Sequence, residues 1–361
     1  MYKIRIELEK PEPLYLMIKK KILDLIEKGE LKNGDRIPPE EKIANENGIS
    51  RGTVRQALKE LEIEGLIKRY PKKGTFINIP KKIKTKKICV IGKSPKEKQM
   101  LSGYGMEMWG GIEEAVIENG LELSFFILKK LKNDLSIVEK FDGILHIVPM
   151  KEDIEFLKKI KNKRIPLMLL GAKVDGFNYV AVNNKKGVED AIKYLIENGH
   201  RKIGGIFSPL NYFDGYERYI HFLDFLDKNG LPIRKEWIKI MKEYWAEKWV
   251  NEAKNLMKEI LMEKEKPTAI FTAGALVSIG VMECLEEVKE KISIIGFDDF
   301  YLAKYFKPPL TVISQPIWEI GRIGVNRLIK IIDRGGKCEL LLEPKLIIRK
   351  SVKNLNKNEE K

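Results

Sequence analysis

The sequence predicts a small α+β module of three helices and a hairpin, followed by a larger two-lobed α/β domain with parallel sheets. At 361 residues the chain is longer than one average domain. Helical apolar spacing fills its start and ends in two short strands, after which short apolar runs alternate with amphipathic helices. We expect domains over 1–79 and 88–350, with a linker at 80–87 and a flexible tail at 351–361.

The first module has the order helix, helix, helix, hairpin. Apolar residues recur at helical spacing over 14–27, and a shorter helix follows over 40–47. Ser50 is suited to cap a third helix over 51–64. The stretch LIKRYPKKGTFINI then reads as two strands joined by a basic turn.

The third helix has two unlike faces. Its apolar residues form one stripe, consisting of Val54, Ala57, Leu58 and Leu61. Arg51 and Arg55 lie on another face, in the first turns of the helix. A guanidinium can bond bidentately to the O6 and N7 atoms of guanine, which is worth roughly 1–3 kcal/mol of base discrimination. The pattern therefore predicts a helix that packs on one side and reads the major groove on the other.

Neighbouring residues are suited to the DNA backbone. The hydroxyls of Ser50 and Thr53 could bond phosphate at the start of the third helix. Lys72 and Lys73 lie in the turn of the hairpin, where they would add affinity more than sequence preference.

Four motifs, GDRIP, ISRGTVRQAL, LEIEGLI and KGTF, follow one another within residues 13–79. This region resembles the winged helix-turn-helix domain of the GntR family of bacterial transcription regulators. The resemblance implies DNA contacts at the recognition helix and wing, made by Arg36, Ser50, Arg51, Thr53, Arg55 and Gly74. One position departs from the family pattern: Glu41 stands where the family usually carries a basic residue, so we assign it no DNA contact.

The larger domain carries a candidate pocket at its strand ends. Ligands of open parallel sheets bind in the loops that follow the carboxyl ends of the strands. The run ISIIGFDDF is a strand and loop of this kind, and it ends in Asp298 and Asp299.

The motifs GFDD, GHRKI and PTAIF occur within residues 86–350. The region resembles the effector domain of the LacI/GalR family, which has the periplasmic-binding-protein-like fold of type I. Its combination with a GntR-type module is similar to AraR-like arabinose repressors, which implies a sugar or related polyol as effector. By the resemblance Arg218 and Asp298 would bind effector hydroxyls, Trp245 would stack on the ligand, and Tyr104 would face the cleft.

Two departures weaken the expectation of a common sugar. The family's Asn-Asp pair after the PTAIF strand is replaced by Gly274 and Ala275, and His221 stands where a glycine usually follows Arg218. The ligand could therefore differ from a common sugar, or the sensor domain could serve only to join two chains of a constitutive DNA-binding protein.

Bulk properties fit a cytoplasmic DNA-binding protein. The formal charge of +15 suits nucleic acid or an anionic surface, although genome composition or heat adaptation also explains a lysine surplus. We expect no secretory signal and no membrane span. Three distant cysteines without a CxxC pair predict neither disulfide nor zinc site, and no cofactor is expected.

An enzyme is the remote alternative, for example a sugar-modifying one. Gly92, Lys93 and Ser94 imitate the end of a phosphate-binding loop, but Lys87 replaces its first glycine, and neither GxSxG nor HExxH occurs. We expect instead a homodimeric repressor on a palindromic operator, released when effector closes the sensor lobes.

Overall fold

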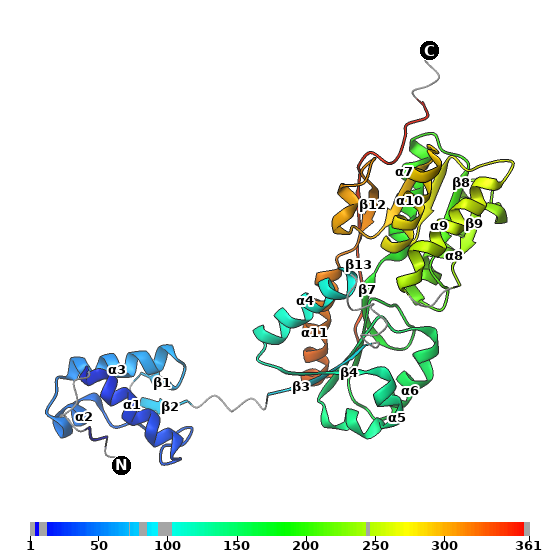
Figure 1. The fold of residues 1–361 in the computed structure, drawn as a ribbon. Coiled ribbons are helices and arrows are strands. Elements are labelled where there is room, and N and C mark those ends of the chain that lie inside the picture. Colours follow the sequence, from blue (N-terminus) through cyan, green and yellow to red (C-terminus); the bar gives the residue numbers. More distant parts are fainter. Residues whose placement is uncertain are drawn as a thin grey trace. The chain divides into compact units, whose positions relative to one another are not determined.

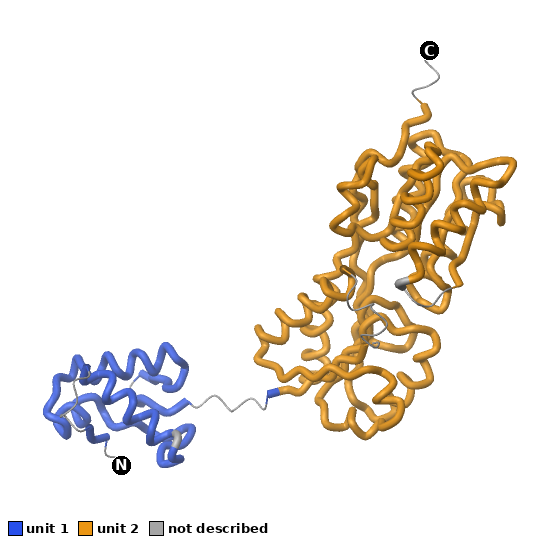
Figure 2. The backbone as a smooth tube through the Cα atoms, viewed as in Figure 1, with its two compact units in different colours: residues 1–85 blue, residues 86–361 orange. Residues whose placement is uncertain are grey.

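The computed structural model describes residues 4–6, 13–71, 73–78, 85–92, 103–242 and 246–356. The chain forms two compact units, Met1–Thr85 and Lys86–Lys361 (Figure 2). No helix in the described ranges is long and apolar enough to cross a membrane.

The first unit contains three helices and a two-stranded hairpin, as the sequence predicts. Its elements are α1 (Leu14–Glu27), α2 (Glu40–Asn47), α3 (Arg51–Ile63), β1 (Ile67–Tyr70) and β2 (Gly74–Ile77). The predicted apolar stripe of α3 is at most 1% exposed and packs against α1 and α2. Burial of this stripe fixes which face of α3 remains in solvent.

The second unit consists of two lobes, each built on a six-stranded sheet (Figure 1). The first lobe has the strand order β13-β7-β6-β5-β3-β4, and all of its pairings are parallel. Its strands are β3 (Lys87–Gly92), β4 (Glu122–Ile127), β5 (Gly143–Ile147), β6 (Leu167–Leu170), β7 (Asn178–Val182) and β13 (Glu339–Leu342).

The second lobe has the order β14-β12-β11-β10-β8-β9, in which only β14 runs antiparallel to its neighbour. Its strands are β8 (Ile203–Phe207), β9 (Ile238–Ile240), β10 (Ala269–Thr272), β11 (Ser293–Phe297), β12 (Thr311–Ser314) and β14 (Lys345–Ile347). The predicted fold class, a winged helix-turn-helix followed by a two-lobed parallel α/β domain, is confirmed.

Helices cover both faces of each sheet, and apolar clusters lie between helices and strands. In the first lobe they are α4 (Gly103–Glu118) and α11 (Ile317–Arg334) on one face, and α5 (Leu128–Asn133) and α6 (Ile154–Asn162) on the other. In the second lobe they are α9 (Ala246–Met262) and α10 (Ala275–Val288), opposite α7 (Asn184–Glu197) and α8 (Phe213–Lys228).

Helices α4 and α11 touch through their backbones. A Cβ atom on Gly111 would lie 2.0 Å from the Trp318 carbonyl oxygen, and one on Gly321 would lie 2.2 Å from the Met108 carbonyl oxygen. Only glycine permits this approach, which anchors α11 to the first lobe.

The chain passes between the lobes three times, after β7, after β12 and after β13. Asn183 joins two of these crossings, because its N–H donates to the Leu342 carbonyl at 2.8 Å and its amide donates to Glu343 at 3.0 Å. The crossing segments form the hinge between the lobes.

The predicted flexible tail at 351–361 is wrong for its first six residues. Ser351 is 4% exposed; its hydroxyl donates to the Ile294 carbonyl at 2.6 Å and accepts from the Thr311 N–H at 2.8 Å. The Leu355 N–H donates to the Asn198 carbonyl at 2.9 Å. These contacts come from distant segments, so a polar local sequence gave no sign of them. Residues 357–361 lie outside the described ranges.

Candidate functional site

Helix α3 begins at an ordered N-terminal turn. The Ser50 hydroxyl accepts from the Thr53 N–H at 3.0 Å and lies 2.8 Å from the Thr53 hydroxyl. This cap fixes where the helix starts and leaves the neighbouring Arg51 exposed on its first turn. Among the described residues Arg51 makes no ion pair, so its guanidinium is available to an external partner.

Arg55 is held in place by α2. Its Nε lies 3.1 Å from Oε2 of Glu40, and the other oxygen of the same carboxylate lies 3.1 Å from Nη1 of Arg69 on β1. The Arg55 side chain nevertheless stays 59% exposed. Glu40 therefore orients a recognition-helix arginine without covering it, a role that the sequence analysis missed. Glu40 is the first residue of α2, and only the packing of α2 on α3 reveals the pairing.

The wing is a tight hairpin beside Arg36. The backbone of 35–37 runs along β2, with the Ile37 N–H bonded to the Thr75 carbonyl at 2.9 Å. Gly74 has φ +115°, and a Cβ there would lie 2.8 Å from Nε of Arg36. The backbone angle thus favours glycine at this position, and a side chain there would also displace the Arg36 guanidinium. Lys73 is exposed beside it, whereas Lys72 lies outside the described residues.

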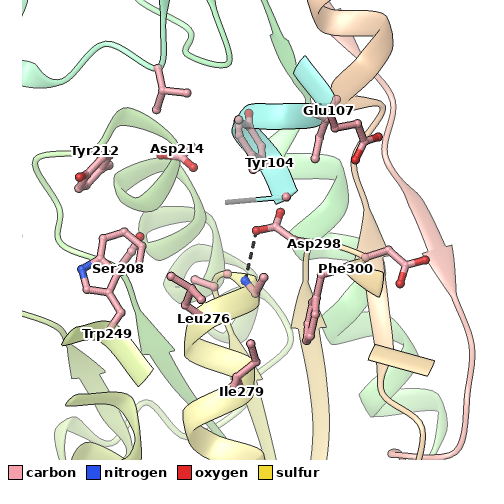
Figure 3. A pocket seen from close by; sticks show the side chains of 18 of the residues that line it. Tyr104, Glu107, Ser208, Tyr212, Asp214, Trp249, Leu276, Ile279, Asp298 and Phe300 are labelled. Atoms are coloured by element: carbon pink, nitrogen blue, oxygen red, sulfur yellow. Dashed lines mark hydrogen bonds between the residues drawn. The ribbon is translucent and has the colours of Figure 1, made fainter. Parts of the chain in front are cut away.

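A cavity of about 480 Å³ lies between the two lobes of the second unit (Figure 3). Residues of the first lobe that line it include Tyr104, Glu107, Val148 and Ile317; those of the second include Ser208, Tyr212, Asp214, Arg218, Trp249, Leu276, Ile279, Asp298 and Phe300. Three of the four predicted effector residues thus face one space. Trp245 lies outside the described residues. Trp249, four residues later in the sequence and within α9, lies edge-on to the Tyr212 ring, with the ring centres 5.6 Å apart.

Arg218 is 2% exposed and held on three sides. Its Nε donates to Oδ1 of Asn184 at 2.9 Å, and its Nη1 donates to the Ala273 carbonyl at 3.1 Å. The guanidinium carbon lies 3.9 Å from the centre of the Phe297 ring. Nη2 lies 3.4 Å from the Asp214 carboxylate and makes no hydrogen bond among the described residues. A ligand oxygen could therefore accept from Nη2.

Asp298 follows β11 in a backbone conformation with φ 81°, which L-residues rarely adopt and which Asp and Asn tolerate best. One carboxylate oxygen accepts from the Gln315 amide, and the other accepts from the Ala275 N–H at 3.3 Å. Burial raises the pKa of Asp298, and the nearby charge of Arg218 opposes the rise. The strained backbone directs this carboxylate to the cavity (Figure 3).

Tyr104 approaches from α4 of the first lobe (Figure 3). Burial raises the pKa of its hydroxyl, and the carboxylates of Asp214 and Asp298 add to the rise. The phenol is therefore neutral and can donate a proton to a hydrogen bond. Burial also raises the pKa of Glu107 on the same helix.

Two hinge residues bond to the polar groups of the cavity, and the sequence analysis did not identify them. Asn184, which accepts from Arg218, is the first residue after the crossing from β7 to α7. Gln315, which donates to Asp298, lies in the crossing from β12 to α11. No local motif marks either residue, because each gains its role only from the tertiary crossing.

The exposed arginines of a capped helix and the polar groups of a two-lobed cavity define a ligand-responsive DNA-binding regulator. Residues 14–77 match the family described as bacterial regulatory proteins, gntR family, and residues 192–352 match the periplasmic binding protein-like domain.

One relative matches nearly the whole chain, and others match about 70–75% of it. The chain is 29% identical to the arabinose metabolism transcriptional repressor of Geobacillus stearothermophilus, over 96% of this chain and all of that protein. It is 32% identical to the HTH-type transcriptional repressor PurR of Actinobacillus pleuropneumoniae serotype 3 (strain JL03), over 70% of this chain and 79% of the relative. The solved lac repressor dimer, bound to operator and the anti-inducer ONPF, has a TM-score of 0.65 at 18% identity, covering 75% of this chain and 96% of that one.

The chain combines a DNA-binding domain of the gntR family with a periplasmic binding protein-like domain. It is a DNA-binding, effector-regulated transcriptional repressor, and it is similar to the arabinose repressor along nearly its whole length.

Proposed function

We propose that this repressor binds a palindromic operator as a homodimer and leaves it when a small polyhydroxylated effector, a sugar or related polyol, enters the cavity. The observation that carries the proposal is the link between cavity and hinge: Arg218 and Asp298 line the cavity, and each bonds to a residue of a lobe crossing. Such a repressor acts in the cytoplasm, where the operator lies.

The proposed operator binding is supported by the exposed face of α3. Arg51 and Arg55 read base edges in the major groove, while Ser50 and Thr53 lie beside a phosphate at the helix start. Each bidentate guanine contact contributes about 1–3 kcal/mol of discrimination. Support comes from the Glu40 carboxylate, which limits the rotamers of Arg55 before DNA binds.

The wing and the segment beside it contact the DNA backbone. Arg36, Lys73 and Gly74 form this surface, and Lys72 is assigned to it from its place in the sequence alone. Lysine contacts to phosphate raise the affinity for every sequence and make it depend on salt.

The proposed effector binding is supported by the hydrogen-bonding groups that line the cavity. Nη2 of Arg218 donates to one ligand hydroxyl, and the carboxylates of Asp298 and Asp214 accept from others. The Tyr104 hydroxyl reaches the ligand from the opposite lobe, so a bound ligand bridges both lobes. We assign the stacking aromatic to Trp249, with Trp245 close to it in sequence.

Closure of the lobes on the ligand transmits binding to the DNA-binding unit. A ligand that bonds both lobes favours the closed hinge, and Asn184 and Gln315 carry the change into the crossings. In a dimer joined through the second units, this movement alters the spacing of the two α3 helices. Switching operator occupancy from 99% to 1% requires about 5.5 kcal/mol of preference for one state.

A second candidate has one observation in its favour: the backbone at Gly274 and Ala275 offers no side-chain polar group to a ligand. A repressor that has lost effector binding would use its second unit only to dimerise. The melting temperature of the full chain with pentoses, hexoses and their phosphates distinguishes the two. Ligand at 100 times its Kd stabilises by about 2.7 kcal/mol. No shift with any of them would favour the constitutive repressor.

A further inference from the structure

The cavity is lined by two chemically different groups of side chains. Asp214, Arg218 and Asp298 are the hydroxyl-binding groups described above, and Asp298 lies against the start of α10. From that point the first turns of α10 present Leu276 and Ile279, and Phe300 lies near them (Figure 3). All three of these apolar side chains are half-buried, so part of each still faces open space. An empty apolar surface of this kind gains free energy when a ligand covers it.

The backbone of the α10 start explains why this part of the lining is apolar. Gly274 is the N-cap residue of α10 and has no side chain to cap the helix. The Ala275 N–H is instead bonded to the Asp298 carboxylate at 3.3 Å. Neither residue brings a polar side chain toward the ligand, although a Cβ on Gly274 would meet nothing closer than 3.8 Å. The absence of polar groups at this wall is therefore not forced by lack of room.

The charges in the cavity disfavour an anionic ligand. The two positive features, Arg218 and the N-terminus of α10, already face the carboxylates of Asp214 and Asp298. Glu107 adds a further carboxylate, and Arg218 is the only basic residue among the described residues of the lining. A phosphate or carboxylate on the ligand would lie among these like charges in a poorly hydrated space, where repulsion is strong.

The volume of the cavity also favours a ligand larger than a single sugar ring. A cavity of about 480 Å³ falls in the range of about 300–1,000 Å³ typical of sites for drug-sized ligands. A single sugar ring bonded to Arg218 and Asp298 would leave the space beside Leu276 and Ile279 unfilled.

We infer that the effector is a hydroxylated ring that carries an uncharged apolar substituent, as in an aryl glycoside or a nucleoside, rather than a free or phosphorylated sugar. The ring hydroxyls bond to Arg218, Asp214 and Asp298, and the substituent covers Leu276, Ile279 and Phe300. This inference rests on the proposed effector function and narrows its ligand class.

The test compares matched ligands on the full chain by isothermal titration calorimetry. The pairs are glucose with nitrophenyl glucosides, and ribose with adenosine and uridine; ribose 5-phosphate and adenosine monophosphate are the anionic members. We expect at least one substituted ligand to bind about tenfold or more tighter than its free sugar, and the phosphorylated forms to bind at least tenfold more weakly than their neutral counterparts.

Two variants probe the apolar wall. Gly274→Asn brings an amide to the wall, and because Asn is a favoured N-cap residue it should preserve folding. Leu276→Ser removes apolar surface, with Met262→Ser as control at an 83% exposed position near the end of α9. We expect Gly274→Asn and Leu276→Ser each to weaken binding of the substituted ligand about tenfold, while neither weakens binding of the free sugar. The control Met262→Ser should change the affinity for neither ligand.

The outcomes separate this inference from the proposed function. A free or phosphorylated sugar that binds as tightly as every substituted ligand, and releases DNA, would overturn the inference and leave the effector function standing. Equal losses for free and substituted ligands in Leu276→Ser would also overturn it. If no ligand of the panel binds, both the inference and the proposed effector control are contradicted.

Discussion

Arg218 should contribute strongly to the stability of the second unit, and Arg218→Met tests this. Methionine keeps the length and the contact with Phe297 but removes the charge and the bonds to Asn184 and Ala273. Two buried hydrogen bonds from a charged donor contribute about 1.5–3 kcal/mol each, and removing one partner of a buried ion pair costs about 3–5 kcal/mol. These contributions overlap, so we expect a loss of about 4 kcal/mol in the free energy of unfolding.

Tryptophan fluorescence during urea unfolding measures this loss in the full chain. All five tryptophans follow residue 85, so their signal reports on the second unit alone. Arg201→Met is the matched control, because Arg201 is exposed and, within the described ranges, bonds only to the carbonyls of Ile196 at 2.8 Å and His200 at 3.1 Å. We expect this control to lose less than about 1 kcal/mol.

The free energy of unfolding of a folded protein is usually about 5–15 kcal/mol, so a loss of about 4 kcal/mol could leave Arg218→Met largely unfolded. Arg218→Lys provides a milder variant. It keeps the charge but loses the planar fork, so its loss should fall between those of Arg218→Met and the control. If both Arg218 variants lose no more than Arg201→Met, then Arg218 does not hold the second lobe and hinge together, and the reasoning is refuted.

Three further predictions concern charged residues. Burial raises the pKa of Asp298 in the folded chain above its value in the unfolded chain. As pH falls, the folded chain therefore takes up this proton at a higher pH than the unfolded chain does. The contribution of Asp298 to the free energy of unfolding consequently falls as pH rises through the folded pKa. Asp298→Asn, whose side chain tolerates φ 81°, should therefore raise the urea midpoint at pH 7 and flatten its acid dependence; a lower midpoint at pH 7 would contradict this. Glu40→Gln should raise the affinity for random duplex but lower the ratio of operator affinity to random-duplex affinity, because Arg55 loses the carboxylate that orients it. The exposed Arg55–Glu40 ion pair itself contributes under about 1 kcal/mol to stability. Fluorescence anisotropy with both duplexes measures the ratio, and an unchanged ratio would refute the prediction. Arg51→Ala should lower operator affinity by about 1–3 kcal/mol and random-duplex affinity much less, whereas Lys73→Ala should weaken both alike and reduce the salt slope by about one unit; equal losses for Arg51→Ala would exclude it from base readout.

The fold was largely predictable because its elements are marked locally. The buried stripe of α3 is visible as helical spacing, and the strands of both lobes are visible as short apolar runs. The family motifs then give the architecture. Long-range pairing could not be predicted. β13 is a short apolar run like the other strands, and nothing local shows that it returns to the first lobe to pair with β7. Residues 351–356 are locally like a polar loop, yet they pack on the second lobe.

The candidate sites were predictable only as far as single residues. The motifs indicate Arg51, Arg218 and Asp298, but not the neighbours that orient them. Glu40 beside Arg55 is separated from it by 15 residues, and Gln315 is 17 residues from Asp298. Such partners depend on how helices pack and where the chain crosses between lobes, which no local pattern encodes.

Operator affinity measured while the cavity is filled shows whether effector binding controls α3. The duplex is the DNA upstream of the chain's own coding sequence, followed by fluorescence anisotropy, and the ligand is the tightest binder found by calorimetry. If effector in the cavity controls α3, operator release should follow cavity occupancy and approach completion, which corresponds to about 5.5 kcal/mol of coupling. A ligand that saturates the cavity and leaves operator affinity unchanged would exclude effector control of DNA binding.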